Sequence, residues 1–505
     1  MQKTFNMKKI FLSCTVPAIM TAYIFSGCSK LLDKQPVTQV PRPFDTTSTI
    51  SATDAENSMK GLYTYYKNDI EEFSVFDRQT NGDAISDNCY AGGDNTDNIT
   101  LDNFTANSLN GNVARDWKDA YAFIGRANIT IHDVERCKDA ALSATRKNQI
   151  LGEARFMRAF TYFDLVRLYG RVPLILSPAN TADAESLLNS TIVAQSSTDS
   201  VYDTIRNDLW FALQNVGEAG ASPSKYIVSK GAVNATLALV YATMPTKNWD
   251  SVLYYCNKVI PAYQLLPQFS YLWDNNHKNN DEAIWEINYD GYSAGDQIGN
   301  WVPSICVGGS IGKYEGGGWK KFNLPSNDLV NDFLAEGDSI RLKNTITFLD
   351  ISGQFSDPNW PSTKYPFLTK FNDPSGGIND FYIIRLPDIL LLKAEALVEK
   401  GEIVNAIALV NDVRARVGLA PKSTANPDTA RSIILNERRL ELAGEGIRWF
   451  DLLRTGQAIT VMNALAVKGS DGQPLQYNVQ PYRLLMPIPQ TEMDLNPKLI
   501  QNDGY

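Results

Sequence analysis

Helical periodicity is the feature that most constrains the fold of this chain. Apolar residues recur at three- to four-residue spacing in nine separate segments, which places them on one face of an amphipathic helix. The chain has 505 residues, of which 44% are hydrophobic, so it can bury a large core. The predicted helices cover residues 52–68, 113–138, 146–169, 200–214, 229–243, 249–260, 387–400, 402–417 and 429–443. We therefore expect a mainly α fold.

Two pairs of these helices have the pattern of tetratricopeptide-like hairpins. The pairs lie at 231–254 and 391–410, and each combines a short connection with alternating small and large residues. A single hairpin of this kind cannot bury its own apolar face, so several must stack into a scaffold. The sequence predicts a tetratricopeptide-like helical-hairpin scaffold with long irregular loops and a few short strands.

Long stretches without periodicity separate the predicted helices. They cover residues 73–112, 289–324, 351–379 and 468–480, and irregular segments of such length are usually functional or disordered. Short runs at 283–288 and 482–488 have the composition of strands. We expect small sheets to support loop-rich excursions near residues 73–112 and 270–380.

The N-terminus has the features of a bacterial lipoprotein signal. Lysines precede an apolar stretch at 10–25, and small residues then lead to Cys28, as in a lipobox. Cleavage before Cys28 would free this residue to carry lipid, whereas the alternative is a simple secretory signal with an incidental cysteine. We expect a signal peptide at 1–27, a Pro- and Thr-rich tether at 28–50 and a single domain at 51–505.

Charge and cysteine content narrow the possible partners. The net charge of −9, with no Lys/Arg-rich run, argues against nucleic acid and fits neutral ligands better. Cys89, Cys137, Cys256 and Cys306 follow no metal-binding spacing, and both disulfides and buried thiols remain open for them.

The sequence contains few residues in patterns typical of catalytic sites. Residues 308–312 satisfy the G-x-S-x-G pattern, but the glycine-rich segment after them does not predict the required helix. The histidines, His132 and His277, both precede Ser310, whereas hydrolases of that class place histidine last. An acidic stretch at 83–98 lacks the spacing of a calcium loop. Two carboxylates suffice for glycoside hydrolysis, so the sequence does not exclude it. We expect no enzyme, no cofactor and no metal.

Exposed aromatic and polar residues point instead to ligand binding. Sugar rings stack their C–H faces on aromatic rings, while sugar hydroxyls need polar partners. Trp273 and Trp285 are expected in the core, since they lie in apolar runs. One candidate wall contains Tyr289, Tyr292, Asp296, Asn300, Trp301, Tyr314 and Trp319. The other contains Arg78, Asn81, Asp83, Asn88 and Tyr90.

Four landmarks in order make the chain resemble the SusD/RagB family. The first landmark is GEARFMRAF at 152–160, together with residues 162–174. The second is RLPDILL at 385–391, together with residues 394–396 and 411–419. The third is ERR at 437–439 with RWFDL at 448–452, and the fourth is the ending at 487–505. Within the third landmark, Glu437, Glu441 and Glu445 recur every four residues beside arginines. We interpret these charges as a salt-bridge network that closes the scaffold, in preference to paired catalytic carboxylates.

The resemblance implies a SusD-like fold and a place in nutrient import. Members of this family are lipid-anchored at the cell surface of the outer membrane and form a lid over a SusC-like TonB-dependent transporter. The resemblance implies that this chain delivers oligosaccharides to such a transporter without catalysis, through loops from the same two parts of the chain. RagB-type members take peptides, which is the alternative ligand class.

Overall fold

The computed structural model describes most of the chain after the N-terminal 48 residues. The described residues are 49–180, 182–220, 224–291, 299–300, 302–303, 321–371, 373, 376–469 and 472–505. Within them, Thr49–Pro178 and Leu188–Tyr505 form one compact unit. The expected signal peptide, Cys28 and nearly all of the tether lie outside the described residues.

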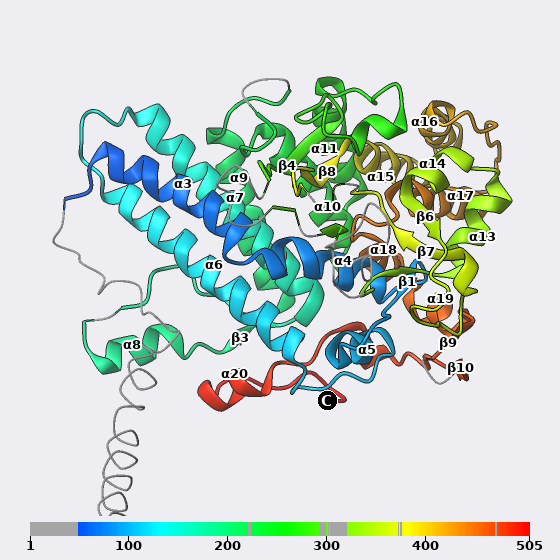
Figure 1. The fold of residues 1–505 in the computed structure, drawn as a ribbon. Helices are drawn as coiled ribbons and strands as arrows, with labels where there is room; N and C mark the ends of the chain where they lie inside the picture. The colour runs from blue at the N-terminus through cyan, green and yellow to red at the C-terminus, as the bar shows by residue number, and fades with distance from the viewer. Residues whose placement is uncertain are drawn as a thin grey trace, which may run out of the picture. The chain divides into compact units, whose positions relative to one another are not determined.

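Helices dominate the described structure, as the periodicity predicts (Figure 1). Their bounds are α3 Ala52–Asn68, α4 Asp77–Gln79, α5 Thr96–Asp102, α6 Gly111–Arg136, α7 Ala144–Tyr169, α8 Ala184–Thr191, α9 Thr198–Asn215, α10 Lys230–Thr243, α11 Trp249–Val259, α13 Asn327–Glu336, α14 Ser339–Thr345, α15 Leu386–Glu399, α16 Ile403–Arg416, α17 Pro427–Leu442, α18 Arg448–Arg454, α19 Ala458–Ala464 and α20 Gln490–Leu495. The mainly α fold class is confirmed.

Four of the predicted helices begin two residues earlier than the apolar pattern indicates. Asn110, Ser143, Ser197 and Asn426 cap α6, α7, α9 and α17, each accepting a hydrogen bond from the backbone N–H three residues ahead. A capping side chain satisfies a backbone donor that no helical carbonyl reaches. The first helical turn is polar in these cases, so periodicity alone misses it.

The strands form short antiparallel pairs. They are β1 Cys89–Tyr90 with β5 Leu324–Pro325, β2 Val172–Pro173 with β3 Gln195–Ser196, β4 Ala283–Ile287 with β8 Phe381–Arg385, β6 Ile346–Leu349 with β7 Tyr365–Leu368, and β9 Val467–Lys468 with β10 Pro474–Leu475. The predicted strand at 283–288 is confirmed as β4. The one predicted at 482–488 is wrong, because Pro481–Leu484 is a 3₁₀ helix and no strand follows it.

The stretch 73–112, expected to be an irregular excursion, is helical over 73–84, 96–102 and 111–112. Glu72–Phe76 and Thr80–Ala84 are π-helical turns on either side of α4, and α5 follows. Phe73, Val75 and Phe76 are at most 5% exposed, so this segment runs through the interior. Its many polar residues suggest a surface loop, but their partners lie elsewhere in the sequence, where local patterns cannot show them.

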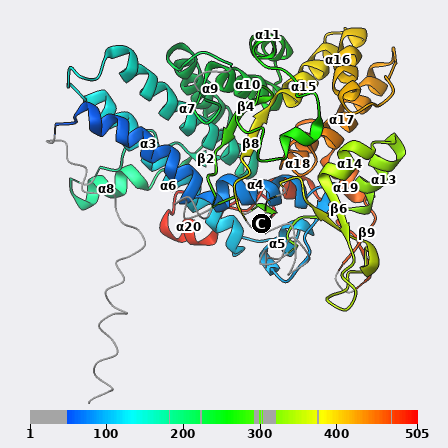
Figure 2. The ribbon, with the colours of Figure 1, turned by 45° about the horizontal axis from the view of Figure 1, so that its top comes forward.

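The two predicted hairpins are α10–α11 and α15–α16, and they pack against each other through α11 and α15 (Figures 1 and 2). Ala232, Ala235 and Ala238 on α10 are fully buried. At Gly231 an added Cβ would lie 2.0 Å from the hydroxyl oxygen of Tyr263, so only glycine fits there. Close helix packing therefore depends on these small residues, as the sequence pattern indicates.

The tryptophans expected in the core are there. Trp285 on β4 is 2% exposed, and its ring meets those of Phe156 and Phe160 on α7 edge-on, with centroids 5.1 and 5.0 Å away. Trp273 is 6% exposed and packs edge-on against Tyr382 of β8. Aromatic pairs in this geometry add to the stabilisation from apolar burial, and these pairs fix β4 and β8 against the helices.

Candidate functional site

The first predicted ligand wall lies inside the protein. Asn81, Asp83, Asn88 and Tyr90 are each at most 5% exposed. The amide of Asn81 donates to Asp116 at 2.7 Å, which ties the π-helical segment to α6. We correct the sequence expectation for these residues: their side chains hold the fold together and do not form a wall open to ligand.

The same segment is fastened to the C-terminal motif. Asp83 accepts hydrogen bonds from the Asn88 amide at 3.0 Å and from the Gly446 N–H at 2.6 Å. Burial raises the pKa of Asp83 to about 6. The Oδ1 of Asn88 accepts from Arg439 Nε at 2.9 Å. Arg78, the remaining member of the predicted wall, pairs with Asp164 of α7 at 2.8 Å.

Arginines of the third landmark make the strongest of these contacts. Arg448 binds both carboxylate oxygens of Asp87 at 2.7 Å, a bidentate geometry that fixes direction as well as distance. Burial opposes ionisation of Asp87, yet Arg448 and Arg439 hold its pKa below the usual value. Residues 361 positions apart in sequence thus form one buried ion pair.

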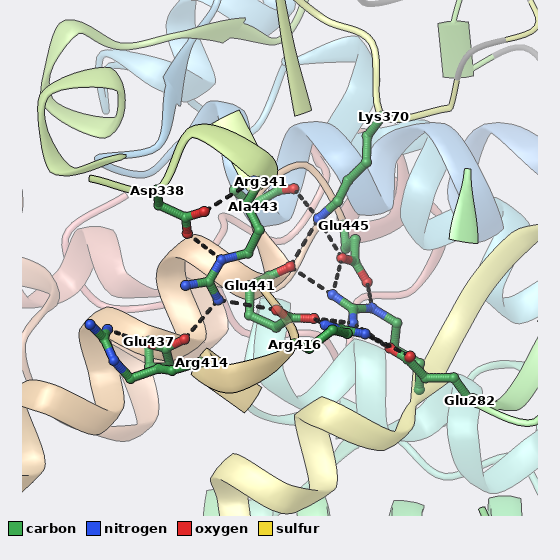
Figure 3. A network of polar contacts seen from close by, with 11 residues as sticks. Glu282, Asp338, Arg341, Lys370, Arg414, Arg416, Glu437, Glu441, Ala443 and Glu445 are labelled. Atoms are coloured by element: carbon green, nitrogen blue, oxygen red, sulfur yellow. Dashed lines mark hydrogen bonds and ion pairs between the residues drawn. The ribbon is translucent and has the colours of Figure 1, made fainter. Parts of the chain in front are cut away.

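A larger buried network surrounds Glu441 (Figure 3). Glu441 accepts from Arg385 at 2.5 Å and from Arg341 at 3.1 Å, and it also pairs with Arg416. Arg385 reaches Glu445 at 2.6 Å and Glu282 at 3.0 Å. We call the whole set the charge lattice: Glu282, Asp338, Arg341, Lys370, Arg385, Arg414, Arg416, Glu437, Glu441 and Glu445.

The predicted salt-bridge network is confirmed, with a different set of partners. The guanidiniums next to the three glutamates come mainly from α14, β8 and α16, and not from the neighbouring Arg438 and Arg439. Burial opposes ionisation of Glu441, but Arg416, Arg385 and Arg341 lower its pKa strongly. A fully buried carboxylate held ionised by three cations does not exchange protons near neutral pH, so it is suited to stability and not to acid–base catalysis.

Two members of the second predicted wall, Tyr289 and Asn300, attach to the same segment of the chain. Tyr289 follows β4, and its N–H donates to Asp380 at 3.0 Å. Asn300 donates through its backbone to the carbonyl of Gly377 at 2.9 Å and through its amide to that of Asn379 at 2.9 Å. Tyr289 and Asn300 are therefore both attached to residues 377–380, just before β8.

Asp380 is the centre of this attachment. Besides Tyr289, it accepts from the hydroxyl of Tyr226 at 2.9 Å and pairs with Lys278 at 2.8 Å. Sequence analysis missed Asp380 and Tyr226, because neither lies in an aromatic cluster or motif. Tyr289 and Asn300 are buried at 1% and 0% exposure. The other members of this wall, Tyr292, Asp296, Trp301, Tyr314 and Trp319, lie outside the described residues, and their ligand role stays a prediction.

The described residues contain few groups arranged for catalysis. They include no cluster of three His, Cys, Asp or Glu side chains able to hold a metal ion. His277 pairs with Asp274 at 2.8 Å and stacks on Tyr271, while Ser310 of the G-x-S-x-G pattern lies outside the described ranges. Cys137 and Cys256 are buried thiols. None of the helices in these ranges combines the length and apolar character needed to cross a bilayer.

Two family models match this chain. The model described as the SusD family matches residues 352–505, and the model described as "Starch-binding associating with outer membrane" matches residues 30–242. Together the matches include all four sequence landmarks.

Similar proteins extend the match over most of the chain. SusD-like protein P2 of Formosa agariphila is 28% identical over 439 residues, covering 80% of this chain and 83% of its own. A solved laminarin-binding SusD-like protein is 26% identical, with a TM-score of 0.71, and the match covers 90% of this chain and 100% of that one. Surface glycan-binding protein A from Bacteroides thetaiotaomicron has a TM-score of 0.74 at 21% identity, over 90% and 99% of the two chains, and shares the fold.

Proposed function

Because this chain belongs to the SusD/RagB family, we propose that it captures oligosaccharides at the cell surface and passes them unchanged to a SusC-like TonB-dependent transporter. In this proposal Cys28 carries the lipid that holds the protein on the outer membrane. The Pro- and Thr-rich tether expected at 28–50 would give the body reach from the membrane surface.

The observation that carries the glycan proposal is the likeness to the laminarin-binding relative. It extends over nearly the whole of both chains, and so includes the helical scaffold and the segments between helices. Peptides are the alternative ligand class, and they enter the test below as competing ligands.

The buried charges support a binding role without turnover. The carboxylates of the charge lattice are held by cations and enclosed by the scaffold, so they do not reach a substrate. A capture protein needs a surface that binds and releases, and no proton transfer. The sequence pattern supplies that surface at Trp301 and Trp319, whose rings we propose as a stacking platform for sugar.

Isothermal titration of residues 29–505 tests the ligand class. We expect saturable binding of laminarin or another neutral glycan, with no product after prolonged incubation. Trp301→Ala or Trp319→Ala should weaken binding by about tenfold, since losing one stacked ring removes about 1–2 kcal/mol. Trp210→Ala is the matched control, because Trp210 is 37% exposed on α9 and does not belong to the predicted wall.

Peptide binding without glycan binding would move the ligand to the alternative class. Glycan binding unaffected by both tryptophan variants would keep the function and reject the platform. Product formation would overturn the capture role.

Membrane attachment is tested separately. Full-length protein should fractionate with the outer membrane, and Cys28→Ser should release it or leave its signal uncleaved. Co-purification of the native protein with a TonB-dependent barrel would support the transporter partner. If the protein purified alone from gently solubilised membranes, that partner would be rejected.

A further inference from the structure

A pocket of about 530 Å³ lies between α11, α15, α17 and α18. Its lining comes from the connection into α11, the end of α15, the first half of α17, and the end of α18 with the residues that follow it. Figures 1 and 2 show α15 between α11 and α17, and α15 packs against both. The volume falls within the range of small-molecule pockets. No sequence motif points to this site, because its walls meet only in the folded chain.

Trp249 provides the aromatic part of the lining. Asn248 caps α11 by accepting a hydrogen bond from the Ser251 N–H at 2.9 Å, which places Trp249 in the first helical turn. The Trp249 side chain packs against the core, remains partly exposed and borders the pocket. Because the core already holds this side chain, a ligand that stacks on its ring costs little additional side-chain entropy.

The charges of the lining balance. Three basic and three acidic side chains border the pocket, namely Lys247, Arg431, Arg454, Glu395, Glu399 and Asp428. Arg454 pairs with Glu395 at 2.6 Å, and the two side chains are only 3% and 12% exposed. Arg431 pairs with Glu399 at 2.6 Å and with Asp428 at 2.7 Å. An ionic ligand would meet no excess of opposite charge, so the pocket fits a neutral one.

The lining also offers hydrogen-bonding groups to a ligand. The Lys247 ammonium and the Gln457 side-chain amide border the pocket, and neither has a partner in the described part of the chain. The Glu399 carboxylate accepts from Arg431 and is 24% exposed, so its remaining lone pairs are free to accept more. Donors and acceptors beside an aromatic ring match a sugar, whose hydroxyls do both and whose C–H face stacks.

The walls of the pocket favour a sugar over a peptide. Peptides commonly bind by adding a strand to a sheet edge, by laying a helix in an apolar groove or by docking prolines between aromatic rings. All the lining residues lie on helices or next to helix ends, and the large apolar ones are Trp249, Ile434 and Leu435. A single ring surrounded by polar groups suits a hexose better.

We propose that this pocket is a second sugar-binding subsite, in which a neutral hexose unit stacks on Trp249. Its hydroxyls accept hydrogen bonds from Lys247 and Gln457 and donate one to Glu399. The sugar class rests on the function proposed above, but the site uses a different part of the chain from the aromatic platform proposed there. A polysaccharide that engages both sites gains affinity through linked binding.

Isothermal titration of residues 29–505 with short laminarin oligosaccharides and maltooligosaccharides measures the number of sites. A short oligosaccharide occupies one subsite at a time, so we expect two sugars per native chain. Ser432→Trp places bulk on the α17 side of the pocket, and we expect it to reduce this number to one. Thr429→Trp is the matched control, because Thr429 is exposed on α17 and does not line the pocket.

Single substitutions test the individual contacts in the Trp301→Ala background, where the aromatic platform is weakened. Trp249→Ala should lower the affinity of the remaining site by about tenfold, and Lys247→Ala and Gln457→Ala by about twofold to tenfold each. Thermal unfolding of each variant checks the fold. The Lys247 and Gln457 variants stay informative if Trp249→Ala fails to fold, because their side chains hold no partner in the described ranges.

The outcomes separate this inference from the proposed function. One sugar per native chain, unchanged in Ser432→Trp, would reject the pocket subsite and keep glycan capture. An equal loss in Thr429→Trp would also reject it. Loss of a bound peptide, and not of sugar, in Ser432→Trp would overturn the sugar assignment of the pocket. Absence of any glycan binding by the native chain would overturn the proposed function itself, and the ligand class of the pocket with it.

Discussion

Glu441 and Glu286 are both buried glutamates, but their surroundings differ in kind. Glu441 is 0% exposed and meets three guanidiniums, whereas Glu286 is 1% exposed and, among the described residues, has a hydrogen bond from the Asn279 backbone in place of an ion pair. Nearby cations lower the pKa of Glu441, and burial raises that of Glu286. The comparison teaches that the partners of a buried carboxyl, and not its burial alone, decide whether it is ionised.

The difference follows from the cost of moving a charge out of water. In the charge lattice that cost is offset by several ion pairs at hydrogen-bond distance, so the carboxylate stays ionised. At Glu286 burial raises the pKa and the Asp380 carboxylate raises it further, so the neutral form is favoured. The two glutamates therefore differ in ionisation, although both are buried.

Breaking the charge lattice should have the largest effect. Glu441→Leu leaves Arg341, Arg385 and Arg416 buried without their shared carboxylate, and we expect a loss of about 3–5 kcal/mol in unfolding free energy. Denaturant titration followed by circular dichroism measures it. A loss below about 1 kcal/mol would show that the lattice does not hold the scaffold together.

Removing the buried carboxyl of Glu286 should have the opposite sign. Glu286→Leu deletes a buried group that forms no ion pair among the described residues, and we expect stabilisation of up to about 1–3 kcal/mol. Destabilisation of that size would mean that contacts within the protein, such as the hydrogen bond from the Asn279 backbone, offset the cost of burying Glu286.

The same variant has a predictable pH dependence. The folded native chain keeps a proton on Glu286 that the unfolded chain releases above its ordinary pKa. Native stability therefore falls as pH rises from that value toward the raised folded pKa, by at most about 1.4 kcal/mol per pH unit. The advantage of Glu286→Leu should grow from pH 5 to pH 8 in paired denaturant titrations; a constant difference would contradict the neutral carboxyl.

A surface pair should show the smallest effect. Arg431 pairs with Glu399 at 2.6 Å, but its side chain is 44% exposed, so solvent screens the attraction. Arg431→Ala should change unfolding free energy by about 0.2–1 kcal/mol, and less at high salt. A loss as large as that of Glu441→Leu would show that burial is not what separates the two pairs.

The sequence located the helices because their signal is local. Apolar spacing, helix caps and small residues such as Gly231 act within a few turns, and the structure confirms the predicted helices and both hairpins. The prediction of the first ligand wall was wrong because the contacts of its residues are not local. Asn88 and Asp87 have the composition of a loop, and the sequence does not show that Arg439 and Arg448, 351 and 361 positions later, bind them.

By itself the sequence determined the helical class, the hairpin scaffold and the family landmarks, because periodicity and motif order are properties of neighbouring residues. Only the tertiary structure decided which buried charges are paired with an opposite charge and which are not. Those outcomes depend on contacts between distant segments, such as α3 with α7 and β4 with β8, whose geometry no local pattern records.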